Sequence, residues 1–177
     1  MVAELPQCYV GRHGFALPGK KAEGDGKTPS GIYPIGMAFG YAYTLDTKLK
    51  YRHLKDDDFW IDEAKSPDYN KLVSGKKPTV SHEIMRRNDI AYKIGAVIEY
   101  NFHPIVAGKG SAIFLHVINP GPDPHTAGCV AMDEATLAKL LAWLDAGKHP
   151  HIILNEPEHT AEFYDASLAE PIAKKAK

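Results

Sequence analysis

Strong turn signals divide this chain into short segments, and they constrain its fold more than any other feature of the sequence. The 177 residues include 15 glycines and 13 prolines, with clusters at 24–31 and 119–124. Because these residues interrupt helices and central strands, most segments between them are too short for long helices. The pattern predicts a mainly β protein.

Three segments predict strands. Residues 94–100 and 112–118 are rich in β-branched and aromatic residues and are bounded by glycine or proline, which is typical of central strands. The short apolar run at 151–154 predicts a further strand.

One segment predicts a prominent helix. Over 133–144, leucines recur at helical spacing behind Asp133, which is a suitable N-cap, and Gly147 is expected to end the helix. Residues 81–88 predict a second, short helix with Ser81 as its N-cap, and 62–81 predict a long irregular excursion on the surface.

Length and composition indicate a single globular domain. The chain is 44% hydrophobic and carries a net charge of −1, so nothing in its charge favours nucleic acid as a partner. No apolar run approaches the roughly 20 residues of a membrane span. We expect one domain over 1–155 and a C-terminal tail or surface helix over 156–177. The first 20 residues lack the apolar core of a signal peptide, so the chain is either cytosolic or a trimmed form of an exported protein.

The two cysteines leave a choice between one disulfide and one reactive thiol. Cys8 lies in a plain strand-like context, whereas Cys129 follows Gly128 between a proline-rich loop and the predicted helix. Glycine allows a carbonyl group to approach the backbone beside the thiol, and backbone N–H groups at such a bend can point at a developing oxyanion. A nearby imidazole can also lower the pKa of a thiol.

Two histidines could serve as the base. His116 lies on a predicted strand thirteen residues before Cys129, and His125 lies in the loop four residues before it. We favour His116, because a strand holds a general base more rigidly than a loop. Cys129 could equally be a buried structural thiol and His116 a core histidine, and the spacing alone leaves both interpretations open.

Several segments together resemble the L,D-transpeptidase catalytic domain, the YkuD-like family. The family signature places a histidine on a strand and, after a loop, Ser/Thr-x-Gly-Cys, which matches 111–116 and 126–130 here. Further segments are similar to one bacterial branch of the family, and the likeness covers most of 8–155. These further segments are 23–31, 59–62, 66–70, 85–87 and 100–101.

The resemblance implies an L,D-transpeptidase-like β-sandwich or mixed sheet, with one prominent helix at about 133–144 after the catalytic cysteine. Cys129 would be the nucleophile and His116 its proton acceptor and donor, with the backbone N–H groups of Gly128 and Cys129 as the oxyanion hole. The enzyme would attack tetrapeptide stems of peptidoglycan, release D-alanine and form a thioester on Cys129. Transfer to an amine would then give cross-linking or D-amino-acid exchange.

The resemblance also implies a setting for this activity. It implies no metal and no organic cofactor, peptidoglycan stem peptides as the partner, a monomer, and an exported enzyme in the periplasm or at the cell wall. With water as the acceptor the same thioester would make an L,D-carboxypeptidase or endopeptidase. Two further alternatives are a catalytically silent wall-binding domain with Cys129 bridged to Cys8, and a zinc site built from His116, His125 and Cys129.

The chain departs from the family pattern at two positions. Ala131 stands where many members have arginine, so Arg86 or Arg87 would have to replace its role. Val117 follows the histidine, so a backbone carbonyl is the expected partner of the second imidazole nitrogen. The residues expected to contact substrate are Thr126, His125, Asn101 and Arg86.

Overall fold

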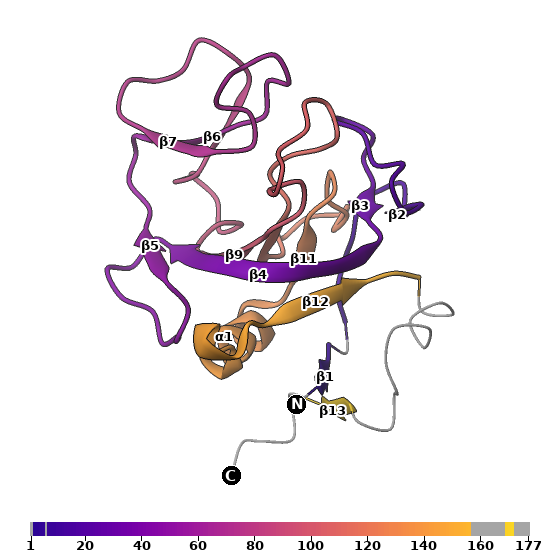
Figure 1. The fold of residues 1–177 in the computed structure, drawn as a ribbon. Helices are drawn as coiled ribbons and strands as arrows, with labels where there is room; N and C mark the ends of the chain where they lie inside the picture. Colours follow the sequence, from indigo (N-terminus) through magenta and orange to yellow (C-terminus); the bar gives the residue numbers. More distant parts are fainter. Residues whose placement is uncertain (1, 6, 157–168, 172–177) are drawn as a thin grey trace.

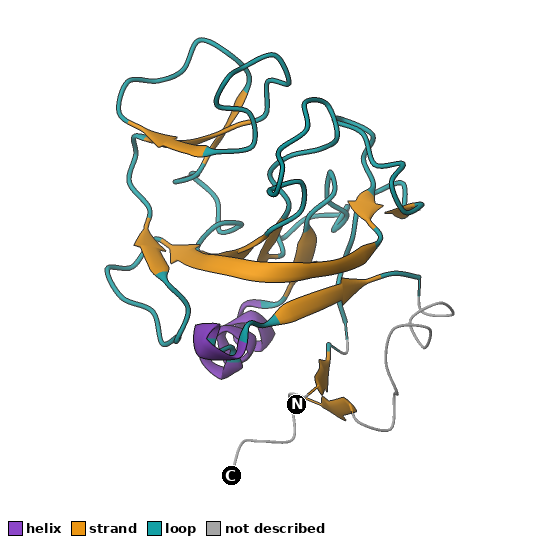
Figure 2. Ribbon diagram, in the orientation of Figure 1, coloured by secondary structure: helices purple, strands orange, loops and turns teal. Residues whose placement is uncertain are grey.

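A six-stranded mixed sheet forms the centre of the protein (Figures 1 and 2). The computed structural model describes residues 2–5, 7–156 and 169–171. The strand order is β11 (Val130–Met132), β10 (Phe114–Val117), β9 (Ile94–Ile98), β4 (Gly31–Gly40) and β12 (His151–Leu154), and β5 (Tyr51–His53) also pairs with β4. The pairs β10–β11 and β4–β5 are parallel and the others antiparallel. The prediction of a mainly β fold with mixed sheets and one prominent helix is confirmed.

The helix α1 (Glu134–Trp143) forms as its sequence predicts. The Asp133 side chain accepts a hydrogen bond from the Thr136 N–H at 2.9 Å, which satisfies one of the free donors of the first turn. The helix ends at Trp143 with Leu144 as its C-cap, within a residue of the predicted end, and Asp145 then caps a separate 3-10 turn, η1 (Ala146–Lys148), which contains Gly147. In Figure 1, α1 lies below the large sheet, and its leucines bury the side chains that β9 and β10 present on that face.

A three-stranded antiparallel sheet lies on the other side of the large sheet (Figure 1). Its order is β7 (Leu72–Ser74), β6 (Asp58–Ile61) and β8 (His82–Ile84). The prediction of a short helix at 81–88 is therefore wrong, because pairing with β6 holds His82–Ile84 extended and outweighs the local capping signal at Ser81. The surface excursion predicted at 62–81 is irregular except for β7.

Two small sheets complete the described fold. β2 (Phe15–Ala16) pairs with β3 (Thr28–Pro29), and β1 (Val2–Glu4) pairs with β13 (Ala169–Pro171), both in parallel. The remainder of the predicted tail, 157–168 and 172–177, lies outside the described residues, so the domain boundary at 155 stays a prediction. Within the described residues, no helix has the length and apolarity that crossing a membrane requires.

Asp58 ties the small sheet to the large one. Its carboxylate is fully buried and accepts hydrogen bonds from the Arg52 guanidinium on β5 and from the Ser74 hydroxyl on β7. It also accepts the backbone N–H of Lys55, 2.9 Å away. A buried carboxylate is stable only when its oxygens are paired in this way, so Asp58 fixes how β6 and β7 approach β5.

We expect Asp58→Ala to lower the free energy of unfolding by about 2–4 kcal/mol, because it leaves buried donors without a partner. Urea denaturation followed by tryptophan fluorescence measures this loss. The neighbouring Asp57 is exposed, and Asp57→Ala is the matched control, expected within about 0.5 kcal/mol of the natural chain. Equal losses in the two variants would contradict this account.

Candidate active site

Cys129 directly precedes β11 and lies on the face of the large sheet away from α1. Val130 pairs with Leu115 across the parallel ladder, so the alternation of side chains puts Cys129 on the same face as Phe114. Its sulfur is buried between two backbone groups. The Phe114 N–H donates to Sγ at 3.4 Å, and the thiol donates to the carbonyl oxygen of Ala112 at 3.1 Å.

His116 projects from the same face as Phe114 and Cys129, since it lies two residues after Phe114 on β10. Its Nδ1 is 2.8 Å from the carbonyl oxygen of Val117. A carbonyl oxygen only accepts, so Nδ1 carries the proton and Nε2 keeps a free lone pair. The expectation of a backbone carbonyl as the orienting partner is confirmed, and this tautomer suits Nε2 to act as a base.

The thiol and the imidazole are not directly bonded in the described structure. The thiol proton is directed at Ala112, and the ring of Tyr92 packs edge-on against His116 with 5.7 Å between ring centroids. The sequence pairs the two side chains as nucleophile and base but does not predict this resting arrangement.

Burial sets the protonation of both groups. The pKa of Cys129 is raised to about 12, mainly by the loss of solvation and in part by the nearby Glu83 carboxylate. The Phe114 N–H and the charges of Lys21 and Arg87 act in the opposite direction. Burial also lowers the pKa of His116 below its ordinary 6.5. The resting pair is therefore a neutral thiol and a neutral imidazole, whereas a neighbouring imidazole alone would have favoured a thiolate.

Two buried threonines fix the loop that carries the cysteine. The Thr28 hydroxyl donates to the Gly128 carbonyl at 2.9 Å and accepts the Gly11 N–H at 2.9 Å. The Thr126 hydroxyl donates to the Cys129 carbonyl at 2.7 Å and accepts the Gly128 N–H at 3.0 Å. Thr126 therefore holds the loop, and its contact with substrate stays a prediction.

Gly128 is required at its position for a steric reason. Its φ is +150°, and a Cβ there would lie 2.8 Å from the carbonyl oxygen of Lys27. The oxyanion hole stays a prediction: the Gly128 N–H is bonded to the Thr126 hydroxyl, whereas the Cys129 N–H has no partner among the described residues.

The other expected contacts lie in different surroundings. His125 is exposed on the rim, with its ring 6.3 Å from that of Tyr9. Asn101 holds its own loop through bonds to Val106 and Gly110. The guanidinium of Arg86 binds the carbonyls of Tyr41 and Leu54, so it does not reach the face of Tyr92.

Arg87 acts on the pair through its charge. Its guanidinium lies 5.3 Å from the centre of the Tyr92 ring and is paired with Asp89 at 2.7 Å. Of the two arginines considered from the sequence, Arg87 therefore acts electrostatically on the site. The sequence does not show which of these two neighbouring arginines approaches the site, because that depends on the bend that follows β8.

Both cysteines are free, which removes the disulfide alternative. Cys8 packs against the core cluster between α1 and the large sheet, while Cys129 belongs to the cluster on the opposite face of that sheet. In the described part of the chain, no three His, Cys, Asp or Glu side chains come together as a metal site would need.

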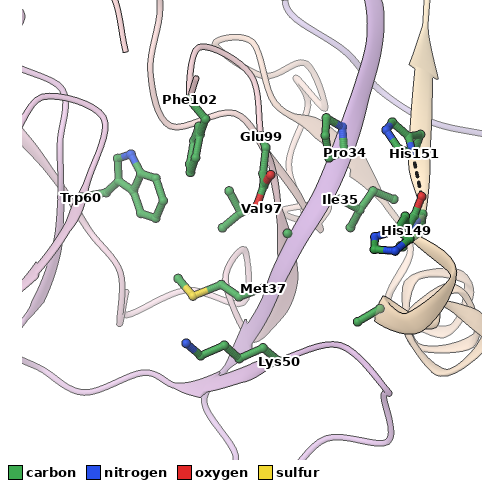
Figure 3. A pocket seen from close by; sticks show the side chains of 13 residues that line it. Pro34, Ile35, Met37, Lys50, Trp60, Val97, Glu99, Phe102, His149 and His151 are labelled. Atoms are coloured by element: carbon green, nitrogen blue, oxygen red, sulfur yellow. Dashed lines mark hydrogen bonds between the residues drawn. The ribbon is translucent and has the colours of Figure 1, made fainter. Parts of the chain in front are cut away.

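A cavity of about 540 Å³ lies around β4, beside its pairing with β12 (Figure 3). Trp60, Phe102 and Glu99 line one side of β4, and His149 and His151 lie on the other. Trp60 packs against Phe114 at 5.0 Å between ring centroids. Neither Cys129 nor His116 lines the cavity, so it is separate from the candidate active site.

Sequence reasoning missed the residues that support the segment before β10. Asn70 is fully buried and binds the Ala112 N–H, and the carboxylate of Glu23 accepts hydrogen bonds from Tyr69 and Ser111. In the sequence, Glu23, Tyr69 and Asn70 stand out only as members of the segments 23–31 and 66–70, which resemble the family. Their contacts span 42 to 88 positions of the chain, so no local pattern could have indicated them.

Comparison with known families gives one match. The family model of the YkuD L,D-transpeptidase catalytic domain matches residues 1–153. No curated protein and no solved structure matches the chain.

We expect Thr28→Val to destabilise the protein by about 2–4 kcal/mol, because it leaves the Gly11 N–H and the Gly128 carbonyl buried without their partner. Thermal unfolding by circular dichroism measures the loss. Thr28→Ser keeps the hydroxyl and is the control, with a loss under about 1.5 kcal/mol for the missing methyl group. If serine and valine were equally destabilising, the hydroxyl would not be what holds the loop.

Proposed function

The chain belongs to the L,D-transpeptidase catalytic domain family, and we propose that it is a cysteine acyltransferase acting on the tetrapeptide stems of peptidoglycan. The single observation that carries this proposal is the placement of Cys129 and His116 on one face of the sheet, with the imidazole fixed in the tautomer that leaves Nε2 as an acceptor.

Acylation uses this pair as nucleophile and base. When the carbonyl of the third stem residue reaches Sγ, Nε2 of His116 takes the thiol proton and the sulfur attacks the carbonyl carbon. The Cys129 N–H stabilises the oxyanion that forms. The tetrahedral intermediate collapses with cleavage of the C–N bond, and His116 gives its proton to the departing amine of D-alanine. The product is a thioester on Cys129.

Deacylation reverses the proton transfers. An amine from a second stem or from a free D-amino acid attacks the thioester, and His116 accepts its proton. The C–S bond then breaks, and the Cys129 thiolate takes the proton back from His116. Water in place of the amine gives L,D-carboxypeptidase activity with the same residues. We place the enzyme at the cell wall, where such stems occur, as an exported protein. The family assignment supports this placement.

We expect Cys129→Ala to abolish release of D-alanine from tetrapeptide muropeptides, since the variant has no nucleophile. His116→Gln should lower kcat/KM by about 10²–10⁴-fold through loss of the base. Cys8→Ala is the matched control. This variant should keep the activity of the natural chain, because Cys8 packs on the α1 side of the sheet, away from Cys129. Chromatography of the products, with and without an added D-amino acid, measures release and separates transfer from hydrolysis. Undiminished release by Cys129→Ala would refute the proposal.

The pH dependence of kcat/KM tests the role of His116. The base must be neutral, and burial lowers its pKa below 6.5, so activity should be lost only as the pH falls through a value below 6.5. Because the thiol pKa is raised to about 12, no thiolate population should limit the rate near neutrality. Initial rates between about pH 4.5 and 9 give the profile. An acid limb centred above pH 6.5 would contradict a buried neutral base.

A further inference from the structure

Ala112 has an unusual backbone conformation next to the nucleophile. Its φ is +53°, in the left-handed region that residues with a Cβ rarely adopt. In this conformation the Ala112 carbonyl faces the sulfur of Cys129 and accepts the thiol proton at 3.1 Å. Something in the surrounding structure must hold the strained residue in place.

Asn70 supplies that restraint. Its side-chain oxygen accepts the Ala112 N–H at 3.0 Å and the indole N–H of Trp60 at 3.0 Å. Its amide nitrogen donates to the carbonyl oxygens of Tyr100 at 3.1 Å and Asn101 at 2.9 Å. With 1% of its surface exposed and four partners satisfied, the Asn70 amide has one allowed orientation.

We propose that Asn70 is a positioning residue which, by fixing the Ala112 amide, keeps the Ala112 carbonyl on the Cys129 thiol, so that the resting nucleophile is a protonated thiol directed away from the base. This inference rests on the proposed function only in treating Cys129 as the nucleophile. When substrate enters, the thiol would then have to leave the Ala112 carbonyl and turn to the imidazole of His116.

The electrostatic reason is the direction of the carbonyl dipole. A carbonyl oxygen stabilises S–H and repels S⁻, so it acts with burial and with the Glu83 carboxylate to disfavour the thiolate. The Phe114 N–H, Lys21 and Arg87 favour the thiolate. His116 and Tyr92 also face this region, and both remain uncharged near neutral pH. Of these influences, the carbonyl is the one that Asn70 controls.

The test is alkylation of Cys129 by iodoacetamide as a function of pH, in a Cys8→Ala background so that only one thiol reacts. Asn70→Ala should release Ala112 to an ordinary conformation and turn its carbonyl away from the sulfur. We expect the midpoint of the alkylation profile to fall by about one pH unit, with a rate near pH 8 about tenfold higher. D-alanine release should fall by about tenfold, because the thiol is less well placed.

Asn70→Asp is a partial rescue: it keeps the accepting oxygen and gives up the two donations to the carbonyl oxygens of Tyr100 and Asn101. Aspartate tolerates the left-handed backbone of position 70, where φ is +57°, and keeps the oxygen that accepts the Ala112 N–H. Its added charge disfavours the thiolate, so the alkylation midpoint should stay at the natural value or rise. A fall like that of Asn70→Ala would overturn the proposal.

A second pair of variants decides the question if Asn70→Ala does not fold. Ala112→Val should reproduce the early alkylation, because a β-branched residue is strongly disfavoured at φ +53°, while Ala112→Gly accepts that conformation and should keep the protected thiol. Natural alkylation profiles in folded Asn70→Ala and Ala112→Val would overturn the proposal. Alkylation needs no peptidoglycan, so a natural chain inactive on muropeptides would overturn the proposed function and leave this inference standing.

Discussion

The two-residue alternation of side chains along β10 is the constraint on which the rest of the structure depends. Leu115 and Val117 point toward α1 and join its leucines in one core cluster, while Phe114 points to the other face and joins Trp60 and Cys129 in a second. His116 follows the alternation of Phe114, so the strand that closes the core beneath the helix also presents the candidate base on the opposite face. A shift of one residue in the register of β10 would bury the imidazole under the helix and disrupt both clusters.

The small sheet that covers this second face sets the protonation of the site. The sheet β7-β6-β8 packs Trp60 against Phe114 and so removes water from the neighbourhood of Cys129. Desolvation then keeps both thiol and imidazole neutral, and polar groups near the sulfur must be satisfied by the protein itself. The hydroxyls of Thr28 and Thr126 and the amide of Asn70 meet this demand by binding backbone atoms of Gly128, Cys129 and Ala112, respectively. The site is thus a rigid arrangement of backbone groups into which only two reactive side chains project.

Part of this arrangement could be predicted from local sequence. The Asp133 cap and the leucine spacing predict α1 to within a residue at each end, and the β-branched runs predict β9, β10 and β12. The prediction fails at 81–88, where β8 forms because β6 offers a pairing edge that no local signal reveals. Candidate site residues divide in the same way. The Gly-Cys turn and the strand histidine are visible as a pattern, but the engagement of the Gly128 N–H by Thr126 and the choice of Arg87 over Arg86 are not.

The sequence by itself determined the family, the mainly β fold and the two side chains, Cys129 and His116, around which a mechanism can be built. These depend on residue types at short spacing, which local pattern records directly. Only the tertiary structure decided the resting state of the site: a neutral thiol held by the Ala112 carbonyl, an imidazole held by its neighbour's carbonyl, and Asn70 holding Ala112 in a strained conformation. The physical reason is that protonation and orientation follow from burial and from hydrogen bonds between segments far apart in the chain, which exist only once the two sheets have packed together.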